Sequence, residues 1–301
     1  MTVAAAESRP NRCGYVVLVG RANVGKSTLL NHLLGQKIAI TSRKPQTTRH
    51  PLTGIRTEGA AQLLIMDTPG VQEVPQRALD RHMNRAALGA LADVDVITML
   101  VDRDAWTTAD DFVLAQVRAA GRPALCVITK IDRLESSDRL LPIIARLSSY
   151  GIFQEIVPVS ALRNRNLDKL LGCIAARLPI AAHLYPDDQI TDRDERFLVQ
   201  EIVREKLIRQ LGQELPYTST VVVESFRVVD DVTHIHAVIF VERAGQKAII
   251  IGKGGLRLRA IGVDARRDIE SLLQSRVMLD LWVKVRSGWS DDDRALKNLG
   301  Y

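Results

Sequence analysis

The sequence has few of the residues that mark a secreted, membrane-spanning or metal-binding protein. Its three cysteines are odd in number and far apart along 301 residues, which argues against disulfides or a zinc site and favours a reducing cytosol. Apolar runs such as 94–101 are much shorter than the roughly 20 residues of a bilayer-spanning helix. Residues 1–12 lack the pattern of a signal peptide, and the six histidines form no ligand cluster. We therefore expect a cytoplasmic protein.

Charge is present in an ordinary amount, but it is unevenly distributed. Charged residues make up 25% of the chain, and the formal net charge is +6. Residues 1–180 carry a net charge of +7, whereas residues 181–301 carry −1. A basic total of this size suits nucleic acid, an acidic lipid surface or simple solubility. The total charge alone therefore assigns no partner.

Short apolar runs alternate with helical patterns over residues 14–181. The runs are too continuous for strands with one wet face, so we expect strands buried on both sides. The expected strands are 15–20, 61–67, 95–102, 123–129 and 155–160, and the expected helices are 26–34, 79–92, 108–120, 138–148 and 166–177. This alternation predicts an α/β domain with a doubly wound, mostly parallel sheet.

A different order follows the segment 182–192, which loses periodicity, carries acidic residues and predicts a linker. Beyond it we expect a helix, two strands, two helical segments separated by glycines and a last strand. The predicted ranges are 193–211, 218–229, 234–242, 246–273 and 279–286. The pattern predicts a small α+β domain over 193–289, with tails at 1–13 and 290–301.

A glycine-rich motif follows the first expected strand. Residues 20–27 read GRANVGKS, which matches the phosphate-binding pattern G-x-x-x-x-G-K-[ST] at a junction of strand and helix. Backbone N–H groups and the helix N-terminus would hold phosphates there, Lys26 would reach the outer phosphates, and the Ser27 hydroxyl would bind Mg²⁺. The predicted phosphate-binding residues are Gly20, Arg21, Ala22, Asn23, Val24, Gly25, Lys26, Ser27 and Thr28.

The sequence DTPGV at 67–71 closes the strand expected at 61–67. Asp67 would hold Mg²⁺ through water, and the Gly70 N–H would donate to a γ-phosphate, so that loss of this phosphate would release the segment that follows. The nucleotide-contacting residues predicted here are Asp67, Thr68, Pro69, Gly70 and Val71.

The loop 41–50 contains no apolar side chain from Thr41 onward and suits a segment that a ligand orders. Within it, Thr48 is the expected second Mg²⁺ hydroxyl, with Thr47 as the alternative. The predicted catalytic residues are Lys26, Thr48, Gly70 and Asn23.

Two further motifs would read the base. In TKID at 129–132, the Asp132 carboxylate can accept hydrogen bonds from N1–H and the exocyclic amine of guanine, whereas adenine offers no such donor pair. Lys130 would lie along the base, and a backbone N–H of the loop at 160–162 would reach the guanine carbonyl. The predicted base-contacting residues are Thr129, Lys130, Ile131, Asp132, Ser160, Ala161 and Leu162. Four motifs at the carboxyl ends of parallel strands predict a GTP site.

The small domain holds a G-x-x-G loop, GKGG at 252–255, between two helical segments. Residues 253–267 carry a net charge of +4. Such a loop lets a single-stranded nucleic-acid backbone approach closely, while arginines neutralise phosphates. A helix that ends in glycine beside a solvated helix is the alternative. The predicted RNA-binding residues are Gly252, Lys253, Gly254, Gly255, Arg257 and Arg259.

Together these residues resemble the bacterial Era GTPases over nearly the whole chain, from Gly14 to Tyr301. The resemblance is carried by GRANVGKSTLLN, ITSRKPQTTRH, DTPGV, TKID, VSAL, IIIGKGGLRLRAIG and LWVKVRSGWSDDDRALKNLGY. It implies an Era-type G domain at 14–181, a type II KH domain at 193–289, and GTP or GDP with Mg²⁺ as ligands. It also implies a monomer that binds the 3′ end of 16S ribosomal RNA, assists its processing and 30S subunit biogenesis, and makes peripheral contact with the inner membrane.

Several positions depart from the patterns of related GTPases. Ala22 replaces a proline, which predicts a tolerable loosening of the loop backbone. Thr129 replaces an asparagine, so we expect modestly weaker guanine binding while Asp132 still sets specificity. Val71 stands where Ras-like enzymes have the glutamine that orients water, which predicts slow intrinsic hydrolysis. Asn23 would either hold a K⁺ ion near the phosphates or shape the loop.

Two other functions remain open from the sequence. One is a membrane-surface or cell-cycle GTPase whose small domain is an adaptor, and the other is a tRNA-modifying GTPase with a similar G domain. The GKGG loop with its arginines argues against both. We therefore expect a GTP-operated RNA binder, in which GTP and Mg²⁺ order residues 41–50 and 67–80 and hydrolysis resets or releases the RNA complex.

Overall fold

The computed structural model describes residues 10–103, 106–212 and 215–301, which form two compact units. Unit 1 comprises the residues up to Lys37 together with Pro51–Glu73 and Arg85–Asp192. Unit 2 comprises Ile38–His50, Val74–Asn84 and Arg193–Tyr301. Over the described ranges, no helix is long and apolar enough to cross a membrane.

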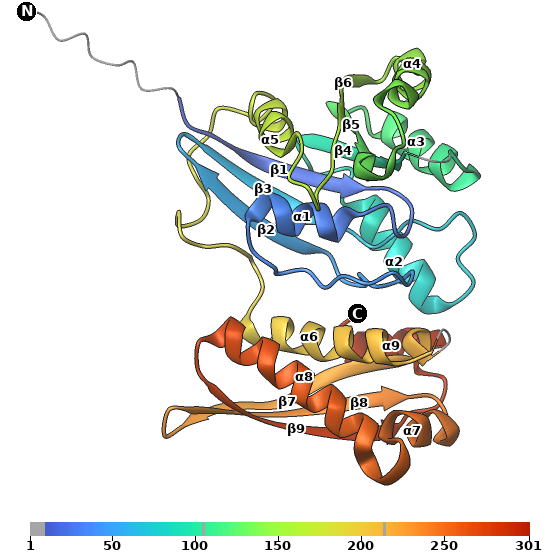
Figure 1. Cartoon of the computed structure of the whole chain (residues 1–301), viewed down its shortest axis with the longest axis vertical. Coiled ribbons are helices and arrows are strands. Elements are labelled where there is room, and N and C mark those ends of the chain that lie inside the picture. The colour runs from blue at the N-terminus through green and yellow to red at the C-terminus, as the bar shows by residue number, and fades with distance from the viewer. Residues whose placement is uncertain (1–9, 104–105, 213–214) are drawn as a thin grey trace, which may run out of the picture. The chain divides into compact units, whose positions relative to one another are not determined.

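Unit 1 contains a six-stranded sheet in the order β2-β3-β1-β4-β5-β6 (Figure 1). β2 pairs antiparallel with β3, and every other neighbouring pair is parallel. The strands are β1 (Arg12–Val19), β2 (Leu52–Glu58), β3 (Ala61–Asp67), β4 (Val96–Asp102), β5 (Ala124–Thr129) and β6 (Phe153–Pro158). The predicted mostly parallel sheet is confirmed.

Helices cover both faces of this sheet. α1 and α5 pack together on one face, whereas α3 and α4 contribute to the apolar core on the other. The helices are α1 (Lys26–Leu34), α2 (Ala78–Gly89), α3 (Thr108–Ala120), α4 (Leu140–Ser149) and α5 (Leu167–Ala175). Residues 78–84 of α2 group with unit 2, and its remaining residues group with unit 1. The doubly wound arrangement expected from the alternating pattern is confirmed.

Two edge strands differ from the sequence expectation. β2 was not expected, because its sequence, LTGIRTE, carries a glycine and charged side chains instead of a continuous apolar run. Gly54 packs closely on α1, since an added Cβ would lie 2.5 Å from Leu34 Cδ1 and would force that side chain to shift. β6 was expected to be buried on both sides, but Gln154 and Glu155 are exposed because this strand ends the sheet.

The expected linker runs along unit 1. The Ile55 N–H donates to the Ile190 carbonyl at 2.9 Å, and the Gln62 amide donates to the Tyr185 carbonyl at 2.8 Å. The Thr191 hydroxyl donates to the Thr53 carbonyl at 2.8 Å. The segment before residue 193 therefore adds backbone contacts to β2 and β3, and the domain boundaries proposed from the sequence stay predictions.

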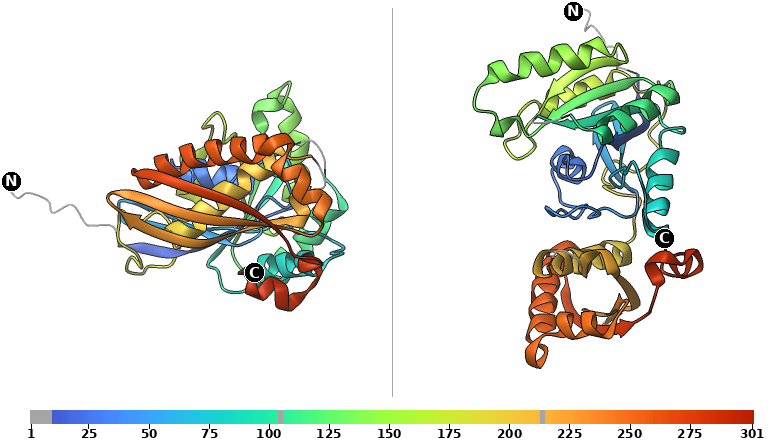
Figure 2. Two further views of the ribbon diagram at one scale, coloured as in Figure 1. Left: turned by 90° about the horizontal axis from the view of Figure 1, so that it is seen from below. Right: turned by 90° about the vertical axis from the view of Figure 1, so that its right-hand side faces the viewer.

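Unit 2 is built on a three-stranded sheet, in the order β7-β8-β9. β7 (Ser219–Val229) and β8 (Val232–Val241) are antiparallel, and β9 (Arg276–Val285) lies parallel to β8. Figure 2 shows the three strands side by side as a curved sheet. Its helices are α6 (Glu195–Gln210), α7 (Ala244–Ile251), α8 (Leu256–Leu273) and α9 (Asp293–Asn298). The predicted α-β-β-α-α-β order is confirmed.

Two apolar clusters stabilise unit 2. One joins α6 and α8 to one face of the sheet through Val203, Ile239 and Ile269, none of which is exposed. The other surrounds the buried Trp289 and includes Leu79, and Val222 of β7 packs against it. The residues after β9 and the start of α2 therefore belong to the packed body of this unit.

Candidate functional site

The phosphate loop connects β1 to α1 in unit 1. Gly25 has φ 111°, a conformation that side chains disfavour, and an added Cβ there would meet no atom within 4 Å. The loop therefore leaves open space beside the helix N-terminus. Gly20 is close-packed instead, because an added Cβ would lie 2.7 Å from the Leu100 carbonyl oxygen. Both glycines of the motif thus have a physical reason to lack a side chain.

Lys26 is folded onto the loop from which it projects. Its ammonium donates to the Gly20 carbonyl at 2.8 Å and to the Arg21 carbonyl at 3.0 Å. Burial lowers the pKa of Lys26 to about 8, and the opposing charge of Asp67 limits the decrease. A phosphate beside this ammonium would favour its charged form.

The two residues expected nearest Mg²⁺ lie in contact with each other. The Ser27 hydroxyl donates to Asp67 Oδ2 at 2.6 Å, and Asp67 is fully buried. The Thr68 hydroxyl donates to the Leu18 carbonyl at 2.8 Å, which anchors the start of the DTPGV segment on β1. A hydroxyl and a carboxylate are the hard oxygen donors that Mg²⁺ prefers, so these residues fit the ion.

The DTPGV segment approaches the phosphate loop closely. An added Cβ on Gly70 would lie 2.7 Å from Ala22 Cα, so only glycine fits between the two backbones. The Val71 N–H donates to the Gly20 carbonyl at 3.4 Å. The Val71 side chain joins the apolar core. It therefore offers no polar group for orienting water, in keeping with the expected slow hydrolysis.

The TKID motif contacts the phosphate loop through its first two residues. The Thr129 hydroxyl donates to the Val24 carbonyl at 2.8 Å, with the Val101 carbonyl also within 3.1 Å. The Lys130 ammonium donates to the Asn23 carbonyl at 2.8 Å. A threonine hydroxyl has a single proton, and protein carbonyls take it here. This geometry gives a physical reason for the weaker guanine binding that we predict.

Asp132 is poised to act as an acceptor. The Ser160 hydroxyl donates to its Oδ1 at 2.6 Å, and this hydrogen bond lowers the pKa of Asp132 below its usual value. Ser160 also accepts from the Arg163 N–H at 3.2 Å, and the exposed Leu162 lies in the same turn. The structure thus brings Asp132 and the loop that contains Ala161 together, as the sequence predicted for a base site.

The loop predicted to supply the second Mg²⁺ hydroxyl belongs to unit 2. The Lys44 ammonium donates to the Ile208 carbonyl at 2.5 Å, and the Thr41 N–H donates to Glu205 at 2.9 Å. Arg204 pairs with Glu201 and donates to the Thr47 carbonyl. Thr47 and Thr48 therefore group with α6 in compact unit 2, and their roles toward Mg²⁺ stay predictions.

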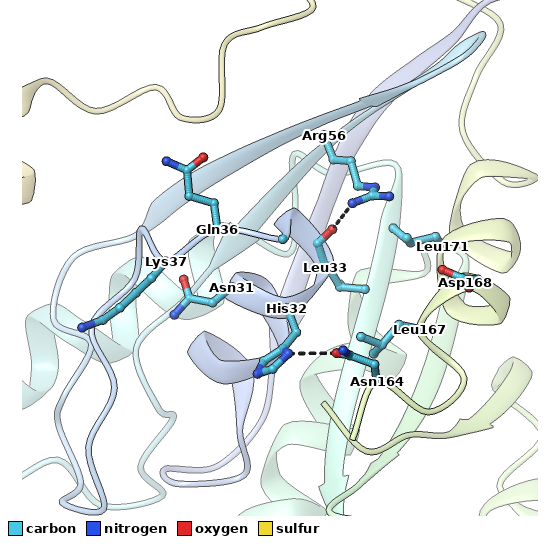
Figure 3. Close-up of a pocket in the computed structure, with 11 residues that line it drawn as sticks. Asn31, His32, Leu33, Gln36, Lys37, Arg56, Asn164, Leu167, Asp168 and Leu171 are labelled. Atoms are coloured by element: carbon cyan, nitrogen blue, oxygen red, sulfur yellow. Dashed lines mark hydrogen bonds between the residues drawn. The ribbon is translucent and has the colours of Figure 1, made fainter. Parts of the chain in front are cut away.

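Unit 1 also contains a cavity of about 530 Å³ that the sequence did not suggest. Figure 3 shows His32 and Asn164 pointing toward one another across it, with Nδ1 and Oδ1 3.1 Å apart. The Arg56 guanidinium donates to the Leu33 carbonyl at 2.7 Å. The cavity is lined by Asn31, His32, Leu33, Gly35, Gln36, Lys37, Arg56, Asn164, Leu167, Asp168 and Leu171. None of the residues predicted to contact nucleotide lines it.

The GKGG loop of unit 2 presents an open backbone. An added Cβ on Gly252 would lie 2.8 Å from Arg257 Cβ, whereas added Cβ atoms on Gly254 and Gly255 would meet nothing within 4 Å. Lys253, Arg257 and Arg259 are exposed around it. The Arg257 guanidinium donates to the carbonyl of Ile249, the last residue but two of α7. The predicted RNA-binding residues therefore lie together, in the GKGG loop and in the first turn of α8 that follows it.

Comparisons with known proteins agree with this geometry. Residues 15–130 match the family described as 50S ribosome-binding GTPase, and residues 214–290 match the KH domain. GTPase Era of Ectopseudomonas mendocina is 56% identical over 97% of each chain, and GTPase Era of Pseudomonas aeruginosa is 55% identical over 97% of this chain and 95% of its own.

Two solved structures are also similar over nearly their whole length. An Aquifex aeolicus Era variant bound to GDP·AlF4⁻ aligns with a TM-score of 0.93 at 37% identity, covering 96% of this chain and 99% of its own. Era in complex with MgGDPNP and nucleotides 1506–1542 of 16S ribosomal RNA aligns with a TM-score of 0.94 at 37% identity, covering 97% and 99%. The chain is a GTPase with a C-terminal KH domain, and it belongs to the Era family.

Proposed function

We propose that this GTPase binds the 3′ end of 16S ribosomal RNA and assists 16S processing and 30S subunit biogenesis. The observation that carries the proposal is its likeness, over nearly all of both chains, to Era in complex with MgGDPNP and a 16S ribosomal RNA fragment. Supporting it, the exposed GKGG turn lies in the unit that also contains the KH match.

Unit 1 supplies the proposed nucleotide site. Lys26 would contact the outer phosphates, the Ser27 hydroxyl would bind Mg²⁺, and Asp67 would hold the ion through water. Asp132 accepts the hydrogen bonds of guanine, and Gly70 donates its N–H to the γ-phosphate. Bound Mg²⁺ neutralises charge that develops on the phosphates. Thr48 would supply a further hydroxyl for Mg²⁺ once GTP orders the loop 41–50.

Unit 2 supplies the proposed RNA site. The open turn at Gly254 and Gly255 lets a phosphodiester backbone approach, and the exposed Lys253, Arg257 and Arg259 neutralise its charge. Leu256, the first residue of α8, is 67% exposed beside this turn and offers an apolar surface for a base. Hydrolysis of GTP then resets or releases the RNA complex.

Crosslinking of the full chain to RNA in bacterial cells, followed by sequencing, tests the RNA target. We expect crosslinks to concentrate at the 3′ end of 16S ribosomal RNA and to depend on the GKGG turn. Crosslinks that concentrate on transfer RNA would favour a tRNA-modifying GTPase instead. An absence of RNA crosslinks would favour the membrane-surface alternative, and either result would contradict the proposal.

We also propose that Asn23 contributes to a K⁺ site beside the phosphates. Asn23 lies in the phosphate loop with φ 62°, a conformation that is uncommon for a residue with a Cβ. A cation placed between the β- and γ-phosphates would stabilise the developing charge, so GTP turnover should be about tenfold faster in K⁺ than in Na⁺ buffer. Equal turnover in the two buffers would leave Asn23 with a loop-shaping role only.

The cellular setting also remains part of the proposal. We propose a cytoplasmic monomer with peripheral contact at the inner membrane, as the resemblance to Era GTPases implies. Flotation of the full chain with vesicles that contain anionic lipid tests this contact. Recovery of all protein in the vesicle-free fraction would contradict it.

A further inference from the structure

Asp102 lies between the two motifs of the nucleotide site. It ends β4, the strand that is flanked in the sheet by β1 and β5. β1 leads into the phosphate loop, β5 leads into TKID, and Asp102 is in register with Thr129. The Asp102 side chain is only 11% exposed. A carboxylate is therefore held at the carboxyl end of this central strand, between the phosphate-binding loop that follows β1 and the base-binding loop that follows β5.

This carboxylate holds Lys130 in place. Asp102 Oδ2 lies 2.6 Å from the Lys130 ammonium, and the same ammonium donates to the Asn23 carbonyl at 2.8 Å. A second cation, Arg103, has its Nη1 3.6 Å from Asp102 Oδ1. A lysine side chain is flexible, and its ammonium can take many positions unless an anion restrains it. Asp102 is the anion that restrains Lys130 beside the phosphate loop.

The contact with Asn23 determines the direction of a backbone amide. Because the peptide unit is planar, the carbonyl of Asn23 and the N–H of Val24 turn together. Asn23 has a positive φ, which a residue with a Cβ adopts only with support from its surroundings. The Thr129 hydroxyl holds the next carbonyl, that of Val24, and so orients the N–H of Gly25. Both amides belong to the loop proposed to bind phosphates.

We propose that Asp102 is a positioning residue for nucleotide binding, acting through Lys130 on the peptide between Asn23 and Val24. Without the Asp102 carboxylate, the Lys130 ammonium binds water in place of the Asn23 carbonyl. The phosphate loop then loses the conformation that it has before nucleotide binds. Part of the free energy of nucleotide binding is then used to order the phosphate loop, so the affinity for nucleotide falls. The inference rests on the nucleotide site proposed for unit 1.

Equilibrium titration with a fluorescent GDP analogue tests this role. Asp102→Ala should weaken binding about tenfold, the loss expected for one charge-assisted hydrogen bond. Asp102→Asn should weaken it only about threefold, because the amide oxygen still accepts from Lys130. Turnover at saturating GTP should stay within about twofold for both variants, since the effect is on binding. Glu58→Gln, which removes the exposed Arg56 ion pair in the same unit, is the control and should bind as the unaltered chain does.

A double variant separates this role from a general loss of stability. Adding Asp102→Ala to Lys130→Met should weaken GDP binding no further, because Asp102 acts through Lys130. The inference would be overturned if the fold-losses in GDP affinity of the two single variants multiplied in the double variant. It would also be overturned if Asp102→Ala bound GDP with unaltered affinity. The Asp102→Asn variant keeps the comparison valid where Asp102→Ala does not fold. Failure of the unaltered chain to bind GDP would instead refute the nucleotide site itself.

Discussion

Replacing Asp132 by asparagine should change the nucleotide preference of this protein from GTP to xanthosine triphosphate. The carboxylate accepts from two guanine donors, and a charge-assisted hydrogen bond contributes about 1.5–3 kcal/mol, so GTP affinity should fall about 100-fold or more. Asparagine presents one acceptor and one donor group, which match N1–H and the C2 carbonyl of xanthine. Asp132→Asn should therefore gain affinity for xanthosine triphosphate while it loses affinity for GTP.

Competition titrations with GTP, ATP and xanthosine triphosphate measure this exchange. Asp138→Asn is a matched control, since Asp138 is an exposed carboxylate of the same unit whose Oδ2 accepts from the Ser136 hydroxyl at 3.2 Å. It should leave all three affinities unchanged. Equal binding of GTP and ATP by the unaltered chain would show that Asp132 does not read the base.

Replacing Gly254 by aspartate should abolish most RNA binding without unfolding the protein. Gly254 has φ 59°, a region that aspartate tolerates better than most residues, and an added Cβ meets no atom within 4 Å. The new carboxylate would lie where the RNA phosphates approach. A like charge at about 4 Å costs about 4 kcal/mol at an effective dielectric of 20, and after screening by salt we expect about 100-fold weaker binding.

Gly121→Asp provides the matched control for this change. Gly121 has φ 63° and equally open surroundings, but it ends α3 in unit 1. The two variants carry the same net charge, so a general charge effect would weaken RNA binding equally in both. We expect only Gly254→Asp to lose RNA, with the GTP turnover of both variants unchanged in the absence of RNA. Retention of RNA by Gly254→Asp would place the RNA site elsewhere.

The sequence predicts those parts of the molecule that depend on local pattern. Continuous apolar runs indicated the central strands, and GRANVGKS indicated a phosphate loop because its glycines lie where the backbone needs them. β2 escaped prediction because its glycine and charged side chains interrupt the apolar run that marks a buried strand. The exposure of Glu155 also escaped, because only the strand order makes β6 an edge.

Long-range contacts explain what the sequence could not predict about the site. Asp102 meets Lys130 only because β4 and β5 pair in a particular register. Likewise, the grouping of residues 38–50 with α6 depends on hydrogen bonds between residues more than 150 positions apart, such as that from the Lys44 ammonium to the Ile208 carbonyl. Neither relation leaves a periodic signal in the chain.

The most direct test of the central claim is the affinity of the full chain for an oligonucleotide with the sequence of the 3′ end of 16S ribosomal RNA. The titration is run with Mg²⁺ and a non-hydrolysable GTP analogue, and then with GDP. We predict tighter binding of this oligonucleotide than of a scrambled one of equal composition, and weaker binding in the GDP state. Equal affinity for both oligonucleotides in both nucleotide states would contradict a GTP-operated protein that reads ribosomal RNA.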